Sequence, residues 1–305
     1  MARVLLTGAT GFVGGAVLAR LRSLRHDVTT VGRTMPRGID PGKHLIADLA
    51  EPATVLRHRE ALEQVEVVAH LGGEVLRAAD PAADHLLRSV QVNVEGTAHL
   101  LAALPRSLAG FCYASTLDVY GSPTSCPVRE DHLPRPGTYY AASKLAAESL
   151  LGVWSARAGV PLAVLRLSHV YGPGDTSAKA IPSFLRACMR GQRPVVLGDG
   201  SDVRDYVYVD DVADAVARAV ERRAAGIFNV ASGAGTSIRE LLSIVQAVTG
   251  AEAEPEWRPA SRPPSTIVLD ITRARTVLEW EPRIALAEGL RRTAAVLTAL
   301  ASTER

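Results

Sequence analysis

Short apolar runs alternate with amphipathic helical patterns through the first half of the chain. The runs predict buried parallel strands at residues 4–6, 28–31, 44–47, 66–71, 108–114 and 161–167. Between most of these runs, apolar residues recur at intervals of three or four, notably at 84–104 and 138–156. Strands that alternate with helices predict a doubly wound α/β fold, with a parallel sheet and ligands at the carboxyl ends of its strands.

A glycine-rich turn separates the first predicted strand from the first predicted helix. Gly8, Gly11 and Gly14 follow the spacing GxxGxxG. Gly8 permits a tight turn, Gly11 leaves room for a pyrophosphate, and Gly14 lets the helix pack closely on the strand. The free N–H groups and the dipole at the start of the helix favour phosphate. Because the motif lies between a strand and a helix, it predicts a dinucleotide site, which includes Phe12 and Val13, rather than an ordinary turn.

The second half of the chain departs from the regular alternation. Residues 181–190, 237–249 and 286–300 predict helices, and 195–197 predict a short strand. The patterns at 207–222 and 227–231 indicate a return to the first sheet. We therefore expect a Rossmann domain and a smaller C-terminal α/β substrate-binding lobe, with the substrate cleft between them. The expected domain comprises residues 1–170 plus about 203–231, and the expected lobe comprises 171–202 plus 232–305.

Composition narrows the classes of partner. The chain has 305 residues, a formal net charge of +2 and no long basic block, which argues against nucleic acid. No apolar run approaches about 18 residues, the length that a membrane span needs. The first strand begins at the N-terminus and leaves no room for a signal peptide. The three cysteines (Cys112, Cys126 and Cys188) share no metal-ligand spacing. We expect a cytoplasmic protein with reduced thiols and with no metal, nucleic-acid or membrane partner.

The end of the second predicted strand bears on the choice of cofactor. NAD-binding folds usually place an acidic residue there to hold the ribose 2′-hydroxyl, whereas this chain has Gly32 and Arg33. An arginine can bind a 2′-phosphate, which favours NADP(H), but an ordinary surface arginine explains the pattern equally well. We therefore expect NAD or NADP. Residues that follow the third and fourth predicted strands should also lie against the cofactor: Asp48, Leu49, Leu71 and Gly72.

A tyrosine and a lysine on a long predicted helix supply candidate catalytic chemistry. Tyr140 and Lys144 are four residues apart, so they share one face of the helix. We expect the Lys144 ammonium to lower the pKa of Tyr140 toward neutrality, so that the phenol can exchange a proton with a substrate. Ser115 and Thr116, at the end of the fifth predicted strand, are candidate hydroxyls near Tyr140, unless they only cap a turn.

Ordered motifs along nearly the whole chain resemble the extended short-chain dehydrogenase/reductase family, which includes nucleotide-sugar epimerases and dehydratases. The matching segments are GATGFVG at 8–14, NVEGT at 93–97, STLDVYG at 115–121, YAASK at 140–144, RLSHVYGP at 166–173, VRDYVYVDD at 203–211, FNVASG at 228–233 and LEWEP at 278–282. So many matches in one order make the resemblance specific.

The resemblance implies roles for residues on the cofactor side of the site. Thr116 aligns with the family's catalytic serine or threonine, and Tyr140 would be the general acid or base. Lys144 would bind the nicotinamide ribose and tune Tyr140. Asn93 and Ser115 are assigned to cofactor binding.

The resemblance also implies a substrate site. Arg204 and Arg262 match arginines that bind the nucleotide diphosphate, a task for which the planar guanidinium is suited. His169 occupies a position that is usually asparagine. The dehydratases that carry an Asp-Glu pair have it where this chain has Leu117 and Asp118. We assign Thr116, Asp118, His169, Arg204 and Arg262 to substrate binding.

The sequence predicts an NAD(P)-dependent epimerase of a nucleotide-diphosphate sugar, which removes and returns a hydride at the sugar C4 through a 4-keto intermediate. The alternative is an NADPH-dependent 4-ketoreductase of a nucleotide-activated (deoxy)sugar. The VRDYVYVDD pattern favours the epimerase, and Gly32-Arg33 favours the reductase. A 4,6-dehydratase or decarboxylase, a non-catalytic NADP(H) sensor and a reductase of small carbonyl compounds are less favoured.

Two predicted helices carry more apolar residues than one sheet-facing stripe needs. They span residues 84–104 and 138–157. Many proteins of the resembled family dimerise by pairing these helices, so the resemblance implies a homodimer.

Overall fold

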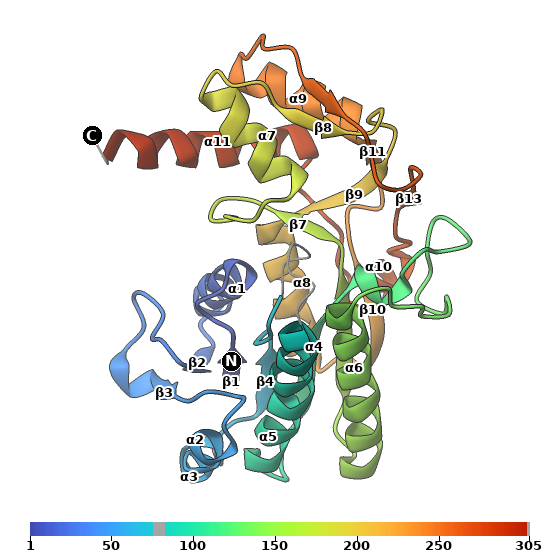
Figure 1. The fold of residues 1–305 in the computed structure, drawn as a ribbon. Helices are drawn as coiled ribbons and strands as arrows, with labels where there is room; N and C mark the ends of the chain where they lie inside the picture. Colours follow the sequence, from blue (N-terminus) through green and yellow to red (C-terminus); the bar gives the residue numbers. More distant parts are fainter. Residues whose placement is uncertain (76–82, 304–305) are drawn as a thin grey trace.

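A parallel sheet forms the centre of the larger lobe (Figure 1) in this computed structural model, which describes residues 1–75 and 83–303. Its strands are β1 (Arg3–Thr7), β2 (Asp27–Gly32), β3 (His44–Ile46), β4 (Val67–His70), β5 (Gly110–Thr116), β6 (Leu162–Leu167) and β10 (Gly226–Val230). The seven strands lie in the order β10-β6-β5-β4-β1-β2-β3, and every neighbouring pair is parallel. This sheet confirms the predicted doubly wound α/β fold.

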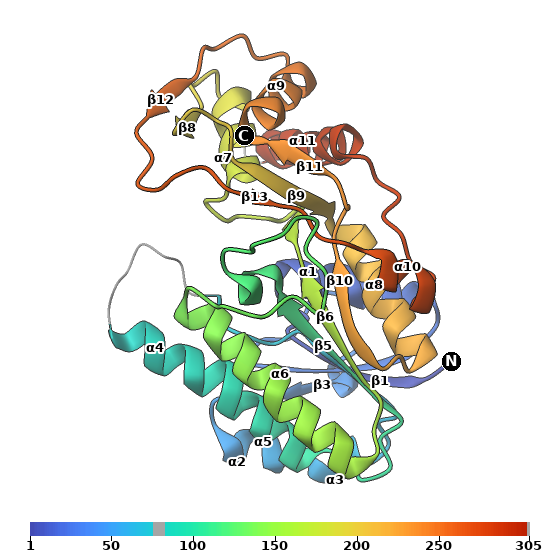
Figure 2. The ribbon, with the colours of Figure 1, turned by 90° about the vertical axis from the view of Figure 1, so that its right-hand side faces the viewer.

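Helices cover both faces of this sheet (Figures 1 and 2). One face carries α1 (Phe12–Ser23) and α8 (Val209–Arg222), which also pack against each other. The opposite face carries α2 (Pro52–Leu56), α3 (Arg59–Leu62), α5 (Gly96–Ala103) and α6 (Tyr139–Ala158). A short helix, α4 (Ala83–Ser89), leads through a π-helical turn (Val90–Glu95) into α5.

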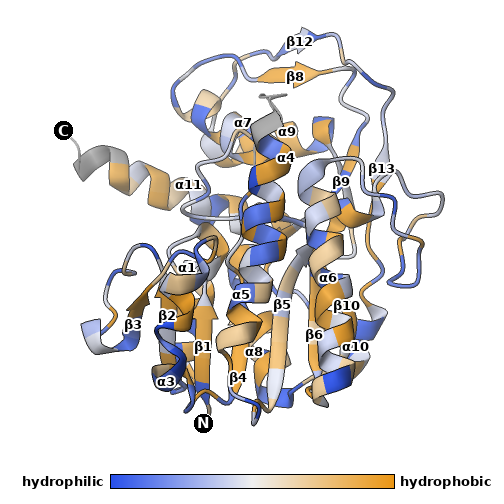
Figure 3. Ribbon diagram, turned by 60° about the horizontal axis from the view of Figure 1, so that its bottom comes forward, coloured by the Kyte–Doolittle hydropathy of each residue, from blue (hydrophilic) through white to orange (hydrophobic). Residues whose placement is uncertain are grey.

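Burial on both faces explains the continuous apolar runs in the sequence. Val4 and Leu6 pack toward α1 and α8, whereas Leu5 packs with the helices on the opposite face. Successive residues of a strand point to opposite faces, so a strand covered on both sides needs apolar residues throughout. Figure 3 shows this as largely hydrophobic central strands, among them β1 and β4.

The smaller lobe is built on a second, mixed sheet. It contains β7 (His169–Tyr171), β9 (Val203–Tyr208), β11 (Gly235–Ser237) and β13 (Thr266–Ile267), and β8 (Val195–Leu197) pairs separately with β12 (Glu256–Arg258). Three helices cover it: α7 (Ala180–Met189), α9 (Ile238–Thr249) and α11 (Leu286–Thr303). The short α10 (Thr272–Val277) instead packs beside β10 of the larger sheet.

The structure differs from the sequence-based expectation at several places. The predicted helix at 84–104 contains the π-helical turn, which periodicity does not reveal because apolar residues continue through it. Strand β5 extends through Ser115 and Thr116, two residues beyond the predicted end. Strand β9 pairs with β7, β11 and β13, so we propose that the chain returns to the larger domain at Val209 and not at about residue 203.

In the described part of the chain, no helix combines the length and the apolar character that a membrane crossing requires.

Candidate active site

The glycine turn brings strand β1 and helix α1 into direct contact. Gly8 has a φ of +73°, a left-handed conformation that favours glycine. A Cβ on Gly14 would lie 1.9 Å from the carbonyl oxygen of Gly8, so only glycine allows this packing. Gly11 begins α1 without a side-chain cap. The first N–H groups of the helix therefore remain available at a surface that Phe12 and Val13 help to form.

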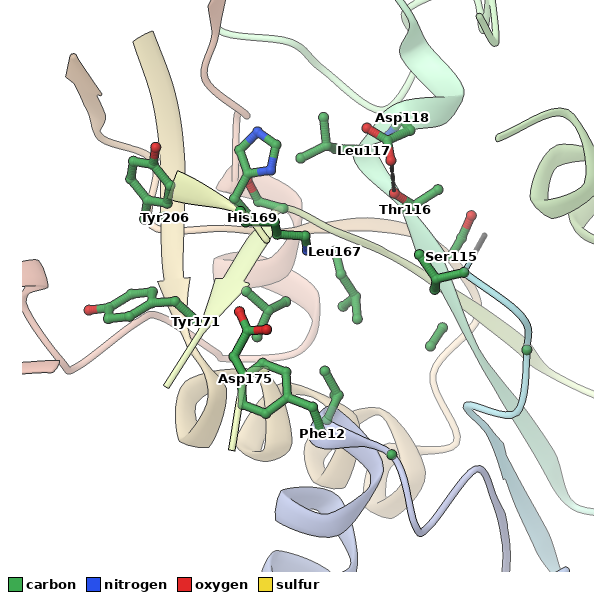
Figure 4. A pocket seen from close by; sticks show the side chains of 18 of the residues that line it. Phe12, Ser115, Thr116, Leu117, Asp118, Leu167, His169, Tyr171, Asp175 and Tyr206 are labelled. Atoms are coloured by element: carbon green, nitrogen blue, oxygen red, sulfur yellow. Dashed lines mark hydrogen bonds between the residues drawn. The ribbon is translucent and has the colours of Figure 1, made fainter. Parts of the chain in front are cut away.

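A cavity of about 560 Å³ lies at this end of the sheet. Its wall joins the glycine turn to residues from β5, α6 and the smaller lobe. Figure 4 shows Thr116 and Asp118 on one side, Tyr171 and Tyr206 on the other, and His169 between them, with Phe12 at the base. The cavity thus lies at the carboxyl ends of the strands, where the sequence predicted the ligand site.

The three expected catalytic side chains line this same cavity. Tyr140 is the second residue of α6, whose start is capped by the Thr138 hydroxyl, which accepts from the N–H of Ala141 at 3.1 Å. Thr116 ends β5, and its hydroxyl donates to Asp118 Oδ2 at 3.2 Å. It also accepts from the Asp118 N–H at 3.2 Å, so this threonine both caps a turn and faces the cavity.

The expected lowering of the Tyr140 pKa is wrong for this structure. Burial raises the pKa of Tyr140, and the negative charge of Asp118 raises it further, while a hydrogen bond with Thr116 has the opposite effect. Lys144 shares the helix face, but its Nζ lies over the ring of Tyr113, 4.1 Å from the ring centroid. Tyr140 is therefore protonated at neutral pH, poised as an acid.

Lys144 is itself buried, and the carboxylate of Glu148 favours its charged form. Burial lowers the pKa of Lys144 to about 7, and Glu148 acts against this shift. Glu148 accepts from Arg166 Nη2 at 2.7 Å and also accepts a hydrogen bond from the Ser115 hydroxyl. Sequence analysis missed Glu148, although the four-residue spacing that pairs Tyr140 with Lys144 also pairs Lys144 with Glu148. Ser115 lines the cavity, but its hydroxyl donates to Glu148 of this ion pair.

Several expected cofactor residues lie behind the cavity wall or at its edge. Asn93 accepts from the N–H of Glu74 at 2.8 Å and donates to Ser143 Oγ at 2.9 Å, so it ties the loop after β4 to α6. Asp48 accepts from the N–H of Ala50 and shapes the turn after β3. Leu71 lines the cavity, as do most of the other expected site residues. Six expected residues do not line it: Arg33, Asp48, Leu49, Gly72, Asn93 and Arg262.

The two expected diphosphate-binding arginines converge on one carboxylate. Arg204 Nη2 donates to Asp202 Oδ1 at 2.9 Å, and Arg262 Nη1 donates to the same oxygen at 3.1 Å. Burial acts to raise the pKa of Asp202, but the Ser265 N–H and the two arginines outweigh it, and the net shift is downward. Arg204 faces the cavity, whereas the Arg262 side chain is about half exposed beside it.

His169 is a neutral, cavity-lining imidazole. Burial, followed by the charges of Lys179 and Arg204, lowers the pKa of His169 to about 3. Its ring packs against Tyr206 with the centroids 5.8 Å apart, and within the described residues its Nε2 has no hydrogen-bond partner. Lys179 and Asp175 also line this end of the cavity, and sequence analysis missed both. Residues 1–75 and 83–303 contain no cluster of His, Cys, Asp or Glu suited to a metal ion.

The chain matches the model of the NAD dependent epimerase/dehydratase family over residues 4–231. It is 35% identical to the UDP-glucose 4-epimerase of Mycolicibacterium smegmatis, over 95% of this chain and 97% of that protein. It is similar to a structure of UDP-glucose 4-epimerase with UDP-glucose from Thermotoga maritima (TM-score 0.87, 28% identity, 98% of this chain and 99% of that one). It is also similar to RMD from Pseudomonas aeruginosa complexed with NADPH (TM-score 0.85, 28% identity, 98% and 100%).

The buried Lys144 generates a prediction for stability. Because burial lowers its pKa from 10.5 to about 7, the folded protein binds fewer protons than the unfolded chain between these values. The resulting destabilisation is complete below about pH 7 and disappears above about pH 10.5. With bound nucleotide removed, Lys144→Met should therefore raise the melting temperature at pH 6.5 by about 2 °C or more, and less at pH 9.5.

The control is Lys43→Met, which removes a half-buried lysine that pairs with Asp27 at the surface. Unlike Lys144→Met, it should not raise the melting temperature more at pH 6.5 than at pH 9.5. Differential scanning calorimetry at both pH values compares the two variants with the unmodified protein. A gain for Lys144→Met that is equal at both pH values would contradict the assigned pKa.

Proposed function

Because the chain belongs to the NAD dependent epimerase/dehydratase family, we propose that it is a nucleotide-sugar 4-epimerase with a bound NAD or NADP. The observation that carries this proposal is the convergence of Thr116, Tyr140 and Lys144 on a cavity that also includes the glycine turn and Arg204. A proton-transfer group, a cofactor turn and an anion-binding arginine in one cavity are the components that this reaction needs.

The residues around the glycine turn fit a dinucleotide. Gly8, Gly11 and Gly14 place no side chain over the start of α1, and the free N–H groups of its first turn suit a pyrophosphate. Gly73, in the loop after β4, also lines the cavity, and a Cβ on it would lie 3.7 Å from Lys144 Nζ. When bound, the nicotinamide supplies hydride chemistry at the sugar carbon.

The chain's own residues supply proton transfer and orientation. The Tyr140 phenol is protonated, so it can return a proton to a sugar oxygen, and it must give up that proton before it can act as a base. Thr116 lies between Tyr140 and Asp118, and its hydroxyl can bridge the phenol and the sugar. Lys144, buried on the same helix face and on the cavity wall, is assigned to the nicotinamide ribose.

The substrate proposal rests on the cations of the smaller lobe. Arg204 faces the cavity beside Lys179, and Arg262 lies next to it. Paired guanidinium groups bind the oxygens of a diphosphate well, so we assign this end to the diphosphate of a nucleotide sugar. The sugar then extends toward Thr116 and Tyr140. The relative in Mycolicibacterium smegmatis and the Thermotoga maritima structure, both UDP-glucose 4-epimerases, support a UDP-sugar.

The second candidate is an NADPH-dependent 4-ketoreductase of a nucleotide-activated sugar. The observation that favours it lies at the end of β2, where Gly32 leaves space and Arg33 is exposed. An arginine there suits a 2′-phosphate, and the RMD structure was determined with NADPH. A dehydratase is less favoured because Leu117, at the position of the dehydratase aspartate, is buried in an apolar cluster.

We also propose that the protein is a homodimer through α4, α5 and α6. Leu87 and Val153 are 67% and 56% exposed, and Val90 and Leu150 are also exposed. A groove between α5 and α6 is lined by apolar side chains, including Leu101, Leu150 and Val153. Figure 3 shows these helices side by side across the sheet, with hydrophobic residues along them. A second copy related by a two-fold axis would present the same apolar surface.

The function is tested by incubating the purified protein with UDP-glucose and with other UDP-, dTDP- and GDP-hexoses. We expect inversion at C4 of at least one sugar, detected by proton NMR, and NAD released when the protein is denatured. Tyr140→Phe should lower kcat by at least about 100-fold while cofactor binding persists. NADPH oxidation with a 4-keto nucleotide sugar, without inversion, would instead support the reductase. Neither activity on any of these sugars would overturn both candidates.

If the cofactor is NADP(H), Arg33→Ala should weaken its binding far more than that of NAD(H). Loss of one charge-assisted contact costs about 1.5–3 kcal/mol, which corresponds to roughly 10- to 150-fold in affinity. Titration calorimetry with both cofactors measures the difference, and Arg37→Ala is a nearby exposed control. Equal effects on the two cofactors would show that Arg33 does not bind the 2′-phosphate.

The dimer is tested by placing a charge on the exposed apolar face. Leu150→Glu, or the half-buried Val94→Glu, should yield monomers in light scattering at micromolar concentration, because a buried unpaired carboxylate opposes association. Leu300→Glu, at an exposed leucine of α11, should remain dimeric. An unmodified protein that is monomeric under these conditions would refute the proposal.

A further inference from the structure

A buried histidine outside the catalytic set contacts both helix α5 and the strand residue that immediately precedes the glycine turn. His70 ends β4 and is fully buried. Its Nδ1 lies 2.6 Å from the hydroxyl of Thr7, the last residue of β1, and its Nε2 lies 3.0 Å from the hydroxyl of Thr97 on α5. Both ring nitrogens therefore have a hydroxyl partner.

Neighbouring backbone groups fix the direction of these hydrogen bonds. The Thr97 hydroxyl donates to the carbonyl oxygen of Asn93 at 2.7 Å, so its oxygen accepts from the His70 Nε2–H. In the neutral ring Nδ1 is then the acceptor, and the Thr7 hydroxyl donates to it. The Thr7 oxygen in turn accepts from the N–H of Gly72 at 2.9 Å. The result is one continuous series of donors and acceptors from Gly72 to Asn93.

The surroundings keep the imidazole neutral. Its centroid lies 5.5 Å from that of Tyr113 and 6.0 Å from that of Phe111. Burial, followed by the charge of Lys144, lowers the pKa of His70 to about 3. A ring with one proton has one donor and one acceptor, which matches the two hydroxyl contacts.

Each end of the series reaches a segment that the proposed function uses. Thr7 immediately precedes Gly8, the first glycine of the turn. A Cβ on Gly72 would lie 2.9 Å from the Thr7 hydroxyl, which shows how closely the loop after β4 packs there. At the other end, the Asn93 side chain donates to Ser143, the residue before Lys144. His70 itself does not line the cavity.

We propose that His70 is a positioning residue for the cofactor, which holds the glycine turn, the loop after β4 and the π-helical turn in one arrangement. It acts through Thr7, Gly72 and Thr97 rather than by contact with the cofactor. The inference rests on the proposed function in one respect, that the glycine turn binds the dinucleotide.

The test compares dissociation constants for NAD and NADPH among three variants. His70→Phe keeps an aromatic ring but leaves two buried hydroxyls without their partner, so it should weaken binding by about tenfold. His70→Gln restores one donor and one acceptor, so its affinity should stay within about threefold of the unmodified protein. His26→Phe removes another buried histidine, which accepts from the Ala2 N–H at 3.2 Å at the amino ends of the strands, and should leave affinity unchanged.

Two further measurements keep the inference falsifiable if His70→Phe fails to fold. Thr97→Val keeps the shape of the side chain but removes the acceptor, and it should also weaken binding by about tenfold. Nitrogen-15 NMR of the imidazole should show the neutral Nε2–H tautomer of His70.

Full affinity in His70→Phe or Thr97→Val, equal weakening by His26→Phe, or an Nδ1–H or charged ring would overturn the role of His70. An unmodified protein that binds neither nucleotide would instead overturn the proposed function, and this inference with it.

Discussion

Polar groups buried at the carboxyl edge of the larger sheet need partners, and this requirement determines how the site is built. Glu148 is satisfied by Arg166 and Ser115, and Asn93 by Glu74 and Ser143. An unpartnered polar group in such a place is destabilising, so each contact also restricts where the neighbouring segments can lie. Behind the cavity wall, these contacts hold β5, β6, α6 and the loop after β4 in one arrangement.

The same constraint separates what the sequence could predict from what it could not. The apolar runs located the strands of the larger sheet because a strand buried on both faces leaves a pattern within a few consecutive residues. The spacing of Tyr140 and Lys144 predicted a shared cavity wall. It could not predict the pKa of Tyr140, which depends on burial by residues far away in the chain. Nor could it place Arg262 on Asp202 beside Arg204, since that contact requires the start of β9 and a distant loop to meet.

The two candidate functions, epimerase and reductase, use the same proposed proton-transfer residues, Tyr140 and Thr116. The proton-transfer residues and the residue that bears on cofactor choice lie apart. Tyr140 and Thr116 line the cavity, whereas Arg33 lies beyond the end of β2, outside the cavity wall. The residues at the end of β2 can therefore differ between proteins of this fold without disturbing Tyr140 and Thr116. This arrangement agrees with the presence of an epimerase and an NADPH-bound protein among the similar structures.

The pairing of Arg204 and Arg262 with Asp202 has a consequence for turnover. Two guanidinium groups and one carboxylate form a cluster with a net charge of +1. Asp202 offsets the repulsion between the arginines, so the diphosphate of the proposed substrate would bind with little reorganisation energy. It also competes with that diphosphate for the same donors. Under the proposed function, the cluster is an anion receptor of moderated strength, suited to releasing a product that carries the same diphosphate as the substrate.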